Sequence, residues 1–323
     1  MTVIRQDDFI DSVADALQFI SYYHPVDFVK AVHQAWEREQ NPAAKDAMAQ
    51  ILINSRMCAQ GHRPICQDTG IVTVFLKIGM KVQWDAALSV ADMVNEGVRR
   101  AYTHPDNVLR ASILEDPAGA RRNTKDNTPA VIQMEVVEGD TVDVQVAAKG
   151  GGSENKSKMV MLNPSDSVVD WVVKTVPTMG AGWCPPGMLG IGLGGTAEKA
   201  AVMAKEALMD PIDIHELRER GPSNRVEELR LEIMEAVNKL GIGAQGLGGL
   251  TTVMDVKIKD YPTHAASQPV AMIPNCAATR HAHYVMDGSG PALQTPPDLD
   301  DWPDSTWEVG EGVRRVNLDT VTP

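Results

Sequence analysis

The chain has 323 residues, of which 43% are hydrophobic and 23% charged, and its formal net charge is −13. This length can bury a sizeable core in one large domain or two smaller ones. The acidic balance argues against nucleic acid as a partner, and no apolar run is long enough to span a membrane. Asp7 and Asp8 stand where a targeting peptide would need basic or hydroxyl residues. The sequence therefore predicts a soluble, cytoplasmic protein that binds neither nucleic acid nor a membrane.

Residues 1–60 have the hydrophobic pattern of helices. Asn41 and Pro42 form a good cap and first turn, and Gly61 is suited to end the helix that they begin. Further upstream, apolar residues recur at spacings of three and four, which places them on one helical face: Ile10, Val13, Leu17 and Ile20. The sequence therefore predicts an N-terminal helical region.

Four later segments have the patterns of strands. Residues 70–79 form a β-branched run bounded by glycines, which predicts a buried strand. Residues 132–136 and 142–146 alternate apolar and polar side chains on either side of a turn at 138–140, and this predicts an antiparallel hairpin. Residues 254–258 alternate in the same way and predict a further strand.

Two further helices are predicted, at residues 196–209 and 224–240. The second begins with Asn224 and Glu227 in the register of a capping box and ends at Gly241. The sequence shows no internal repeat. The order of helices and strands indicates a mixed α/β (α+β) fold, a layered domain with antiparallel strand pairs and an N-terminal helical region.

Residues 291–323 differ in composition from the rest of the chain. Five of these residues are proline, seven are acidic and two are basic, and no apolar period survives. Two interpretations stay open, a solvated tail or a linker toward something outside the chain. Trp302 and Trp307 are expected to dock on a surface, because a large aromatic side chain gains much from burial.

Glycine-rich segments suggest phosphate or carboxylate binding only weakly. Residues 190–195 match GxGxxG and precede a helix, as a dinucleotide site requires, but Pro185 and Pro186 do not fit a central parallel strand just before them. The second match, at 241–246, leads into a strand, which is the wrong context. The glycines at 149–153 form no Walker loop, although their backbone N–H groups could approach a carboxylate closely.

Three of the four cysteines lie in turn-rich segments beside glycine, proline or asparagine: Cys66, Cys184 and Cys276. Cys58 instead continues an apolar helical face and is predicted to be a buried core residue. Three thiolates on three loops suit an iron–sulfur cluster whose fourth iron is left open for substrate. Spacing alone leaves the alternative of three unrelated free thiols. A weaker zinc alternative has two histidines and an aspartate close in sequence: His281, His283 and Asp287.

Five motifs in colinear order resemble class I fumarate hydratase, the oxygen-sensitive, iron–sulfur enzyme family shared with tartrate dehydratase. They are CQDTG, KGGGSENK, CPPGMLGIGLGGT, GIGAQGLGG and PTHAASQPVAMIPNCAATR, which begin at residues 66, 149, 184, 241 and 262. The similarity runs from the first helices to about Gly290. Five motifs in one order are far more specific than any of them alone.

The resemblance implies a [4Fe-4S] cluster held by Cys66, Cys184 and Cys276 in an enzyme that interconverts fumarate and L-malate. In family terms, seven further positions match residues that line the substrate: Gln67, Asp68, Arg110, Gly152, Asn155, Lys156 and His264. The alternative within the family is the α subunit of L-tartrate dehydratase, against which the complete KGGGSENK segment and Arg110 argue. A non-catalytic iron–sulfur or nucleotide-binding regulatory protein is the alternative from another class.

The chemistry of a dicarboxylate explains several of these residue types. Arg110 can bind one carboxylate bidentately, and Gly152 can donate its backbone N–H. Asp68 follows Cys66 by two residues and could transfer the proton of the water, although an Asx turn also explains it. His264 could orient Asp68 or contact substrate, and Lys156 could equally be solvated.

The resemblance also implies partners beyond this chain. Family members have a smaller, swivelling C-terminal domain, either fused or present as a β subunit, which supplies further cations and the base that removes the C3 proton. Nothing after Gly290 resembles it, so residues 1–290 are predicted to be the cluster-binding catalytic domain and 291–323 an acidic linker. We expect a homodimer, and the composition of the linker favours a truncated single-chain enzyme over a natural α subunit.

Overall fold

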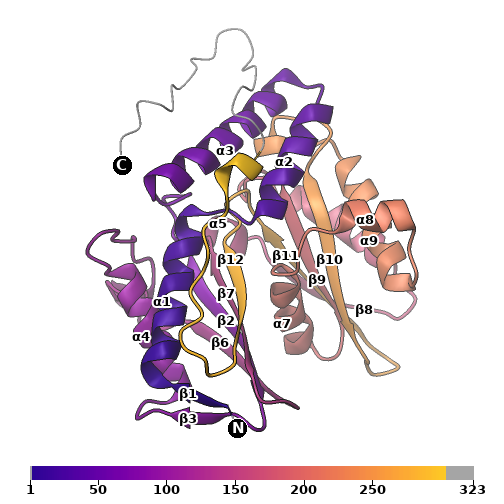
Figure 1. Cartoon of the computed structure of the whole chain (residues 1–323). Helices are drawn as coiled ribbons and strands as arrows, with labels where there is room; N and C mark the ends of the chain where they lie inside the picture. The colour runs from indigo at the N-terminus through magenta and orange to yellow at the C-terminus, as the bar shows by residue number, and fades with distance from the viewer. Residues whose placement is uncertain (1, 303–323) are drawn as a thin grey trace.

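The computed structural model describes residues 2–302 and confirms a mixed α/β fold. Two four-stranded sheets lie beside each other, with helix α7 between them (Figure 1). Two short ribbons complete the strands, β1 (Val3–Arg5) with β3 (Gln83–Asp85) and β4 (Leu114–Glu115) with β5 (Arg122–Asn123). No helix within the described residues is long and apolar enough to cross a membrane.

The first sheet has the strand order β12-β7-β2-β6. Its strands are β2 (Ile71–Gly79), β6 (Val131–Val137), β7 (Val142–Lys149) and β12 (His281–Met286). β2 pairs with β6 in parallel and with β7 in antiparallel register, so it lies between the two strands that the sequence predicts to be a hairpin. The hairpin prediction is therefore wrong.

The burial of these strands gives the physical reason for this order. The continuous apolar run of β2 is buried along most of its length and suits a central strand, whereas β6 is half exposed and suits an edge. The turn at 138–140 then closes over the end of β2, where the N–H of Gly79 donates to Thr141 O and that of Met80 to Val137 O.

Three N-terminal helices and α4 cover the first sheet and the top of the molecule (Figure 1). They are α1 (Gln6–Tyr22), α2 (Val26–Arg38), α3 (Pro42–Gly61) and α4 (Val90–Tyr102). The predicted apolar face of α1 is confirmed, because its four residues are all buried in the core against this sheet. The predicted cap of α3 is confirmed as well, since the Asn41 side chain accepts a hydrogen bond from Ala43 N.

The second sheet has the order β10-β9-β11-β8 and is covered on both faces. Its strands are β8 (Lys158–Leu162), β9 (Gly187–Gly194), β10 (Val253–Tyr261) and β11 (Gln268–Asn275). Its helices are α6 (Val168–Thr175), α7 (Ala197–Ala207), α8 (Ile214–Arg220) and α9 (Arg225–Asn238). The helices predicted at 196–209 and 224–240 correspond to α7 and α9, and Asn224 caps α9 by accepting from Glu227 N.

The GxGxxG segment has a packing explanation in this sheet. A Cβ at Gly190 would lie 2.1 Å from Ala204 O, and one at Gly192 would lie 1.8 Å from Ala200 O. The glycines thus let the backbone of α7 approach β9 closely. Pro185 and Pro186 lie immediately before β9, which is a central strand all the same because it begins only after them.

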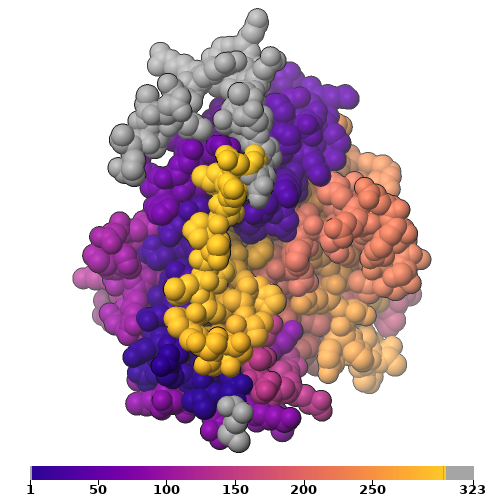
Figure 2. Space-filling view, in the orientation of Figure 1, coloured from indigo at the N-terminus to yellow at the C-terminus, as the bar shows by residue number. Residues whose placement is uncertain are grey.

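The start of the acidic C-terminal segment packs on the N-terminal helices. The backbone N–H of Ala292 donates to Ser12 Oγ (2.8 Å), and that of Gln294 donates to Asp15 Oδ2 (2.6 Å). Figure 2 shows the C-terminal segment, in yellow, lying across the N-terminal helices. After a short 3-10 turn at Leu299–Asp301, Trp302 is buried in a core cluster that includes side chains of α2 and α3. The predicted docking of Trp302 is therefore confirmed, whereas Trp307 lies outside the described residues.

Candidate functional site

Strand ends from both sheets meet where the motif loops lie. In the first sheet β2 begins where β7 ends, with Ile71 paired to Lys149. In the second sheet β9 begins where β11 ends, with Met188 paired to Asn275. The chain crosses between the two sheets twice, from β7 to β8 and from β11 to β12, and both crossings start at these strand ends. Four loops therefore lie close together at this edge of the two sheets. The loops are 62–70, 150–157, 180–186 and 275–280. The second of them, here called the glycine loop, contains the short helix α5 (Gly151–Glu154).

Hydrogen bonds between these loops fix their relative positions. The Gly151 N–H donates to Asp68 Oδ2 (2.6 Å), which joins the first loop to the glycine loop. The Ala277 N–H donates to Cys184 O (3.1 Å) and joins the two remaining loops. The GIGAQGLGG motif supports the Cys184 loop from behind, because the backbone and side-chain N–H groups of Gln245 both donate to Pro185 O at 2.7 Å.

Cys184 lies within electrostatic reach of both other loop cysteines. Burial raises the pKa of the Cys184 thiol, and the neighbouring Cys276 and Cys66 raise it further. Cys184 has a φ of 56°, a left-handed backbone conformation that non-glycine residues adopt mainly at turns and functional sites. Cys58 is buried in α3, as predicted, and burial raises the pKa of its thiol to about 11.

Two buried cations accompany these thiols. Lys149 is 5% exposed, and its Nζ donates to Ser153 Oγ (2.6 Å) and lies 3.6 Å from Glu154. Burial lowers the pKa of Lys149 to about 8, against the opposing attraction of Glu154 and, more weakly, Cys276. Arg280 is 3% exposed, and its Nε and Nη2 have no hydrogen-bond partner within the described part of the chain.

Asp68 and Arg280 face a space that the glycine loop leaves open. A Cβ at Gly150 would lie 3.3 Å from Asp68 Oδ2 and 3.7 Å from Arg280 Nη2. A side chain at this position would therefore fill the space between the two charged groups. Three neighbouring thiols and a buried guanidinium with unused donors fit an anionic iron–sulfur cluster, whose charge such donors would compensate.

The carboxylate of Asp68 is held by two backbone donors. Its Oδ1 accepts from Gly70 N (3.0 Å), which is the Asx turn that the sequence leaves as an alternative, and its Oδ2 accepts from Gly151 N. The turn and a place in the site are therefore compatible. Each carboxylate oxygen keeps a further lone pair for another donor.

The other predicted substrate residues line the same group of loops, apart from His264. The hydroxyl of Thr69 donates to the carbonyl oxygen of Arg110 and ties that segment to the first loop. Lys156 lies against the backbone of the Cys184 loop, because a Cβ at Gly182 would be 3.4 Å from its Cε. Four of these residues are exposed: Gln67, Arg110, Gly152 and Asn155.

His264 lies at the opposite end of the second sheet. It belongs to the loop between β10 and β11, where Thr263 Oγ1 donates to Gly195 O just after β9. The eight residues of β9 separate this loop from Cys184, a span of roughly 25 Å. Its Nδ1 accepts from Ala266 N, and its side chain is exposed. The structure therefore does not bring His264 to the cysteines of its own chain.

The zinc alternative is not assembled. His283 is paired with Asp143 (2.7 Å), and Asp287 Oδ1 accepts from Ser289 N. Within residues 2–302, no three His, Cys, Asp or Glu side chains converge as ligands of a single metal ion do. A cubane cluster requires less convergence, because each thiolate binds a different iron.

Known proteins are similar in sequence to this chain over most of its length. "Putative L(+)-tartrate dehydratase subunit alpha" from Methanocaldococcus jannaschii is 34% identical over 280 residues, which are 84% of this chain and 95% of that protein. "L(+)-tartrate dehydratase subunit alpha" from Escherichia coli (strain UTI89 / UPEC) is 30% identical over 271 residues, 83% of this chain and 87% of that protein. This similarity over most of the chain places it in a family of hydro-lyases. A model of the fumarate hydratase (Fumerase) family matches residues 10–285, so the chain belongs to the class I fumarate hydratase family.

Sequence reasoning missed the two buried cations. Lys149 and Arg280 both stand inside the family motifs, but the motifs alone assign a role to neither. A signal for Lys149 is its position directly after an apolar run, residues 146–148, at the end of β7. Arg280 follows Cys276 by four residues, and nothing in that spacing shows that its guanidinium is buried.

Proposed function

We propose that this chain is the cluster-binding α subunit of a hydro-lyase that removes water from a four-carbon hydroxydicarboxylate. The observation that carries the proposal is the convergence of the Cys66, Cys184 and Cys276 loops with Asp68 and two buried cations. L(+)-tartrate is the first candidate substrate, because the relatives described above are named as tartrate dehydratase α subunits. The motifs alone favour fumarate and L-malate over L-tartrate, and the relatives reverse this order.

L-malate and fumarate are the second candidate pair. Arg110 and the complete KGGGSENK segment support them. The KGGGSENK segment lies among the gathered loops, and the backbone of Arg110 is tied to the first loop through Thr69. Tartrate differs from malate by one hydroxyl group, so a single polar contact in the site can decide between the two substrates.

The residues of this chain supply binding and proton transfer. When bound to Cys66, Cys184 and Cys276, a [4Fe-4S] cluster would supply a Lewis acid that polarises the C–O bond to be broken. Arg110 and Lys156 bind carboxylate groups of the substrate, and the exposed Gly152 offers its backbone N–H. Asp68 holds the proton that leaves with the hydroxyl group as water, because its backbone donors keep the carboxylate oriented.

A second component completes the site. Arg110 and three other predicted substrate residues of these loops are exposed in this chain, whereas efficient electrostatic stabilisation needs water to be excluded. We propose that a separate β subunit covers them and supplies the base that removes the C3 proton. The α-subunit names of the relatives support this arrangement over the truncated single-chain enzyme that the C-terminal composition favoured.

Anaerobic reconstitution with iron and sulfide tests the proposal. We expect broad absorbance near 400 nm that fades in air, and loss of water from L(+)-tartrate once the β subunit is added. Parallel assays with L-malate decide between the two substrates. Failure of the chain to bind iron and sulfide would refute the proposed function, and full activity of the chain alone would refute the need for a β subunit.

A further inference from the structure

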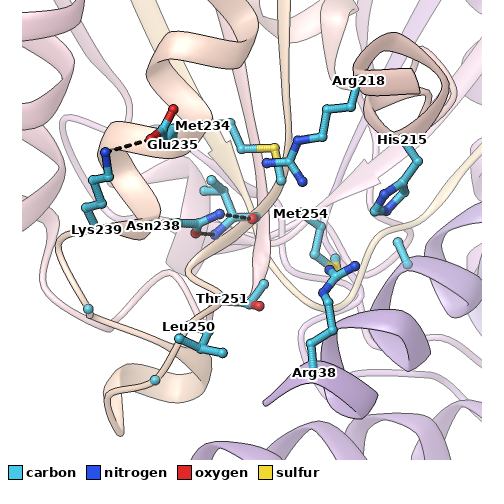
Figure 3. Close-up of a pocket in the computed structure, with 14 residues that line it drawn as sticks. Arg38, His215, Arg218, Met234, Glu235, Asn238, Lys239, Leu250, Thr251 and Met254 are labelled. Atoms are coloured by element: carbon cyan, nitrogen blue, oxygen red, sulfur yellow. Dashed lines mark hydrogen bonds and ion pairs between the residues drawn. The ribbon is translucent and has the colours of Figure 1, made fainter. Parts of the chain in front are cut away.

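A second concave site lies away from the cysteine loops. It is a cavity of about 580 Å³ between α2, α8, α9 and the start of β10 (Figure 3). None of its lining residues belongs to the four loops of the candidate active site. A cavity of this volume lies within the usual range for sites that bind small molecules.

Two arginines point into this cavity from opposite sides. Arg38, in the last turn of α2, and Arg218, on α8, direct their guanidinium groups toward each other across the opening (Figure 3). Within residues 2–302 neither makes an ion pair or a hydrogen bond, although Arg218 feels the charge of Glu235. Burial lowers the pKa of His215, which also lines the cavity, and the charges of Arg38 and Arg218 lower it further, against a weaker opposing effect of Glu219. Both arginines are therefore close enough to act on the same imidazole ring.

Three further polar side chains on the wall, those of Glu235, Lys239 and Asn238, are already engaged. Glu235 forms an ion pair with Lys239 at 2.6 Å, which offsets its charge. The Asn238 side chain accepts from Thr252 N and Val253 N and donates to Val253 O. The two arginines are therefore the principal free hydrogen-bond donors in the described cavity, above an apolar wall that includes Met234 and Met254.

We infer that this cavity binds a small organic anion, with its acidic oxygens between Arg38 and Arg218 and its carbon frame against the two methionines. A guanidinium presents paired donors that match a carboxylate or a phosphate. The chain as a whole carries a charge of −13, so a local pair of unneutralised arginines would attract an anion against the general field. The inference does not depend on the proposed hydro-lyase function.

Calorimetric titration of the full chain at low salt tests this site with three probes, inorganic phosphate, citrate and phenyl phosphate. We expect citrate or phenyl phosphate to bind more tightly than inorganic phosphate, because only they can also contact the apolar wall. Preference between these two identifies the ligand as a carboxylate or a phosphate. Arg38→Gln and Arg218→Gln should each weaken binding about tenfold, since each removes a charge-assisted contact.

Two control variants place the binding in this cavity. Arg99→Gln removes an exposed arginine on α4, and Arg110→Met removes the carboxylate-binding arginine of the candidate active site. Neither should change the affinity of the probes, and melting curves should show that all four variants fold. No binding by either organic probe, or equal binding in both cavity variants, would overturn the inference. Loss of binding in Arg110→Met would also overturn it, since the probe would then occupy the other site.

Discussion

The carboxylate of Asp68 shows how one residue can serve the fold and the site together. Its two oxygens accept backbone N–H groups from two different loops, so the side chain fixes the glycine loop as well as its own turn. Replacement by asparagine would put an amide group toward one of these donors and disturb both arrangements. The sequence pattern alone predicts the turn, whereas the family resemblance is what indicates the site.

The three loop cysteines should be separable from the fourth by iron loading. Serine at Cys66, Cys184 or Cys276 should each abolish cluster assembly, because each thiolate would hold a different iron. Cys58→Ser should leave loading intact, since that thiol is buried in α3. The iron and sulfide content of each variant after anaerobic reconstitution measures its cluster assembly. Near-normal content in Cys184→Ser would refute the ligand assignment.

Arg280 should show opposite effects on stability and on cluster retention. A buried guanidinium with two unused donors is costly, so Arg280→Met should stabilise the apoprotein by about 1–4 kcal/mol. The same variant should lose iron more quickly, because a compensating charge near the cluster is gone. Thermal melts and iron-release rates measure the two effects, and Arg280→Lys should restore part of the retention. Equal iron release in the Met variant and the wild-type chain would contradict this role.

At the scale of elements, close backbone contact explains features that resemble binding motifs. The glycines of β9 allow the backbone of α7 to pack closely against the strand. This contact explains the GxGxxG pattern without a bound nucleotide. The order of the first sheet depends likewise on which strand is most apolar, and not on which strands are consecutive. Alternation predicted the strands β6 and β7 correctly, but it carries no information about their partners.

Gly192→Ala should test the contact between β9 and α7. The new methyl group would meet the Ala200 carbonyl oxygen, and neither backbone can yield without moving the helix. We expect a loss of about 1–3 kcal/mol or more in the free energy of unfolding, measured by urea denaturation. Gly61→Ala is the matched control, because its nearest neighbour would be the Arg63 side chain at 3.6 Å. An equal effect in both variants would contradict the packing explanation.

His24 should make the protein sensitive to acid. Its ring joins α3 to the Cys276 loop, with Nδ1 2.8 Å from Ser55 Oγ and Nε2 3.1 Å from Ala277 O. Burial lowers its pKa to about 3, so below pH 6.5 the unfolded chain binds the proton and the folded chain does not. Stability should therefore fall on acidification from pH 6.5 toward 3, by up to about 4 kcal/mol.

Chemical denaturation across this pH range measures the effect. His24→Gln should reduce the slope while lowering stability at neutral pH, because the hydrogen bonds are weakened. Part of the slope should remain, since burial also lowers the pKa of His281 to about 4. An unchanged slope in His24→Gln would show that this histidine does not carry the effect.

At the scale of the whole molecule, the position of His264 connects catalysis to assembly. Within one chain it lies at the far end of β9 from the cysteines, so its predicted catalytic role requires a second copy of the chain. If the predicted homodimer shares its sites in this way, inactive Asp68→Asn and His264→Asn chains should regain activity when they are refolded together and assayed with the β subunit. No recovery in the mixture, with each variant correctly folded, would remove His264 from the catalytic residues.

The sequence was informative about segments and chemistry, and less so about the relations between distant segments. It predicted the apolar face of α1 and the caps of α3 and α9, because periodicity and capping patterns are local in the chain. It could not show that β2 separates β6 from β7 or that His264 lies apart, since both follow from pairings between distant strands. It also missed the burial of Arg280, which depends on packing by several loops.

The convergence of loops at the strand ends also has a consequence for how the protein matures. Cys66 and Cys276 stand near opposite ends of the chain, and both sheets must form before their thiols become neighbours. If Cys66, Cys184 and Cys276 are the cluster ligands, as proposed, a nascent chain has no complete set of them until Cys276 has been synthesised and both sheets have formed. Iron and sulfide would then be delivered to a folded protein whose site is still accessible. If a β subunit covers that site, cluster delivery has to precede its docking.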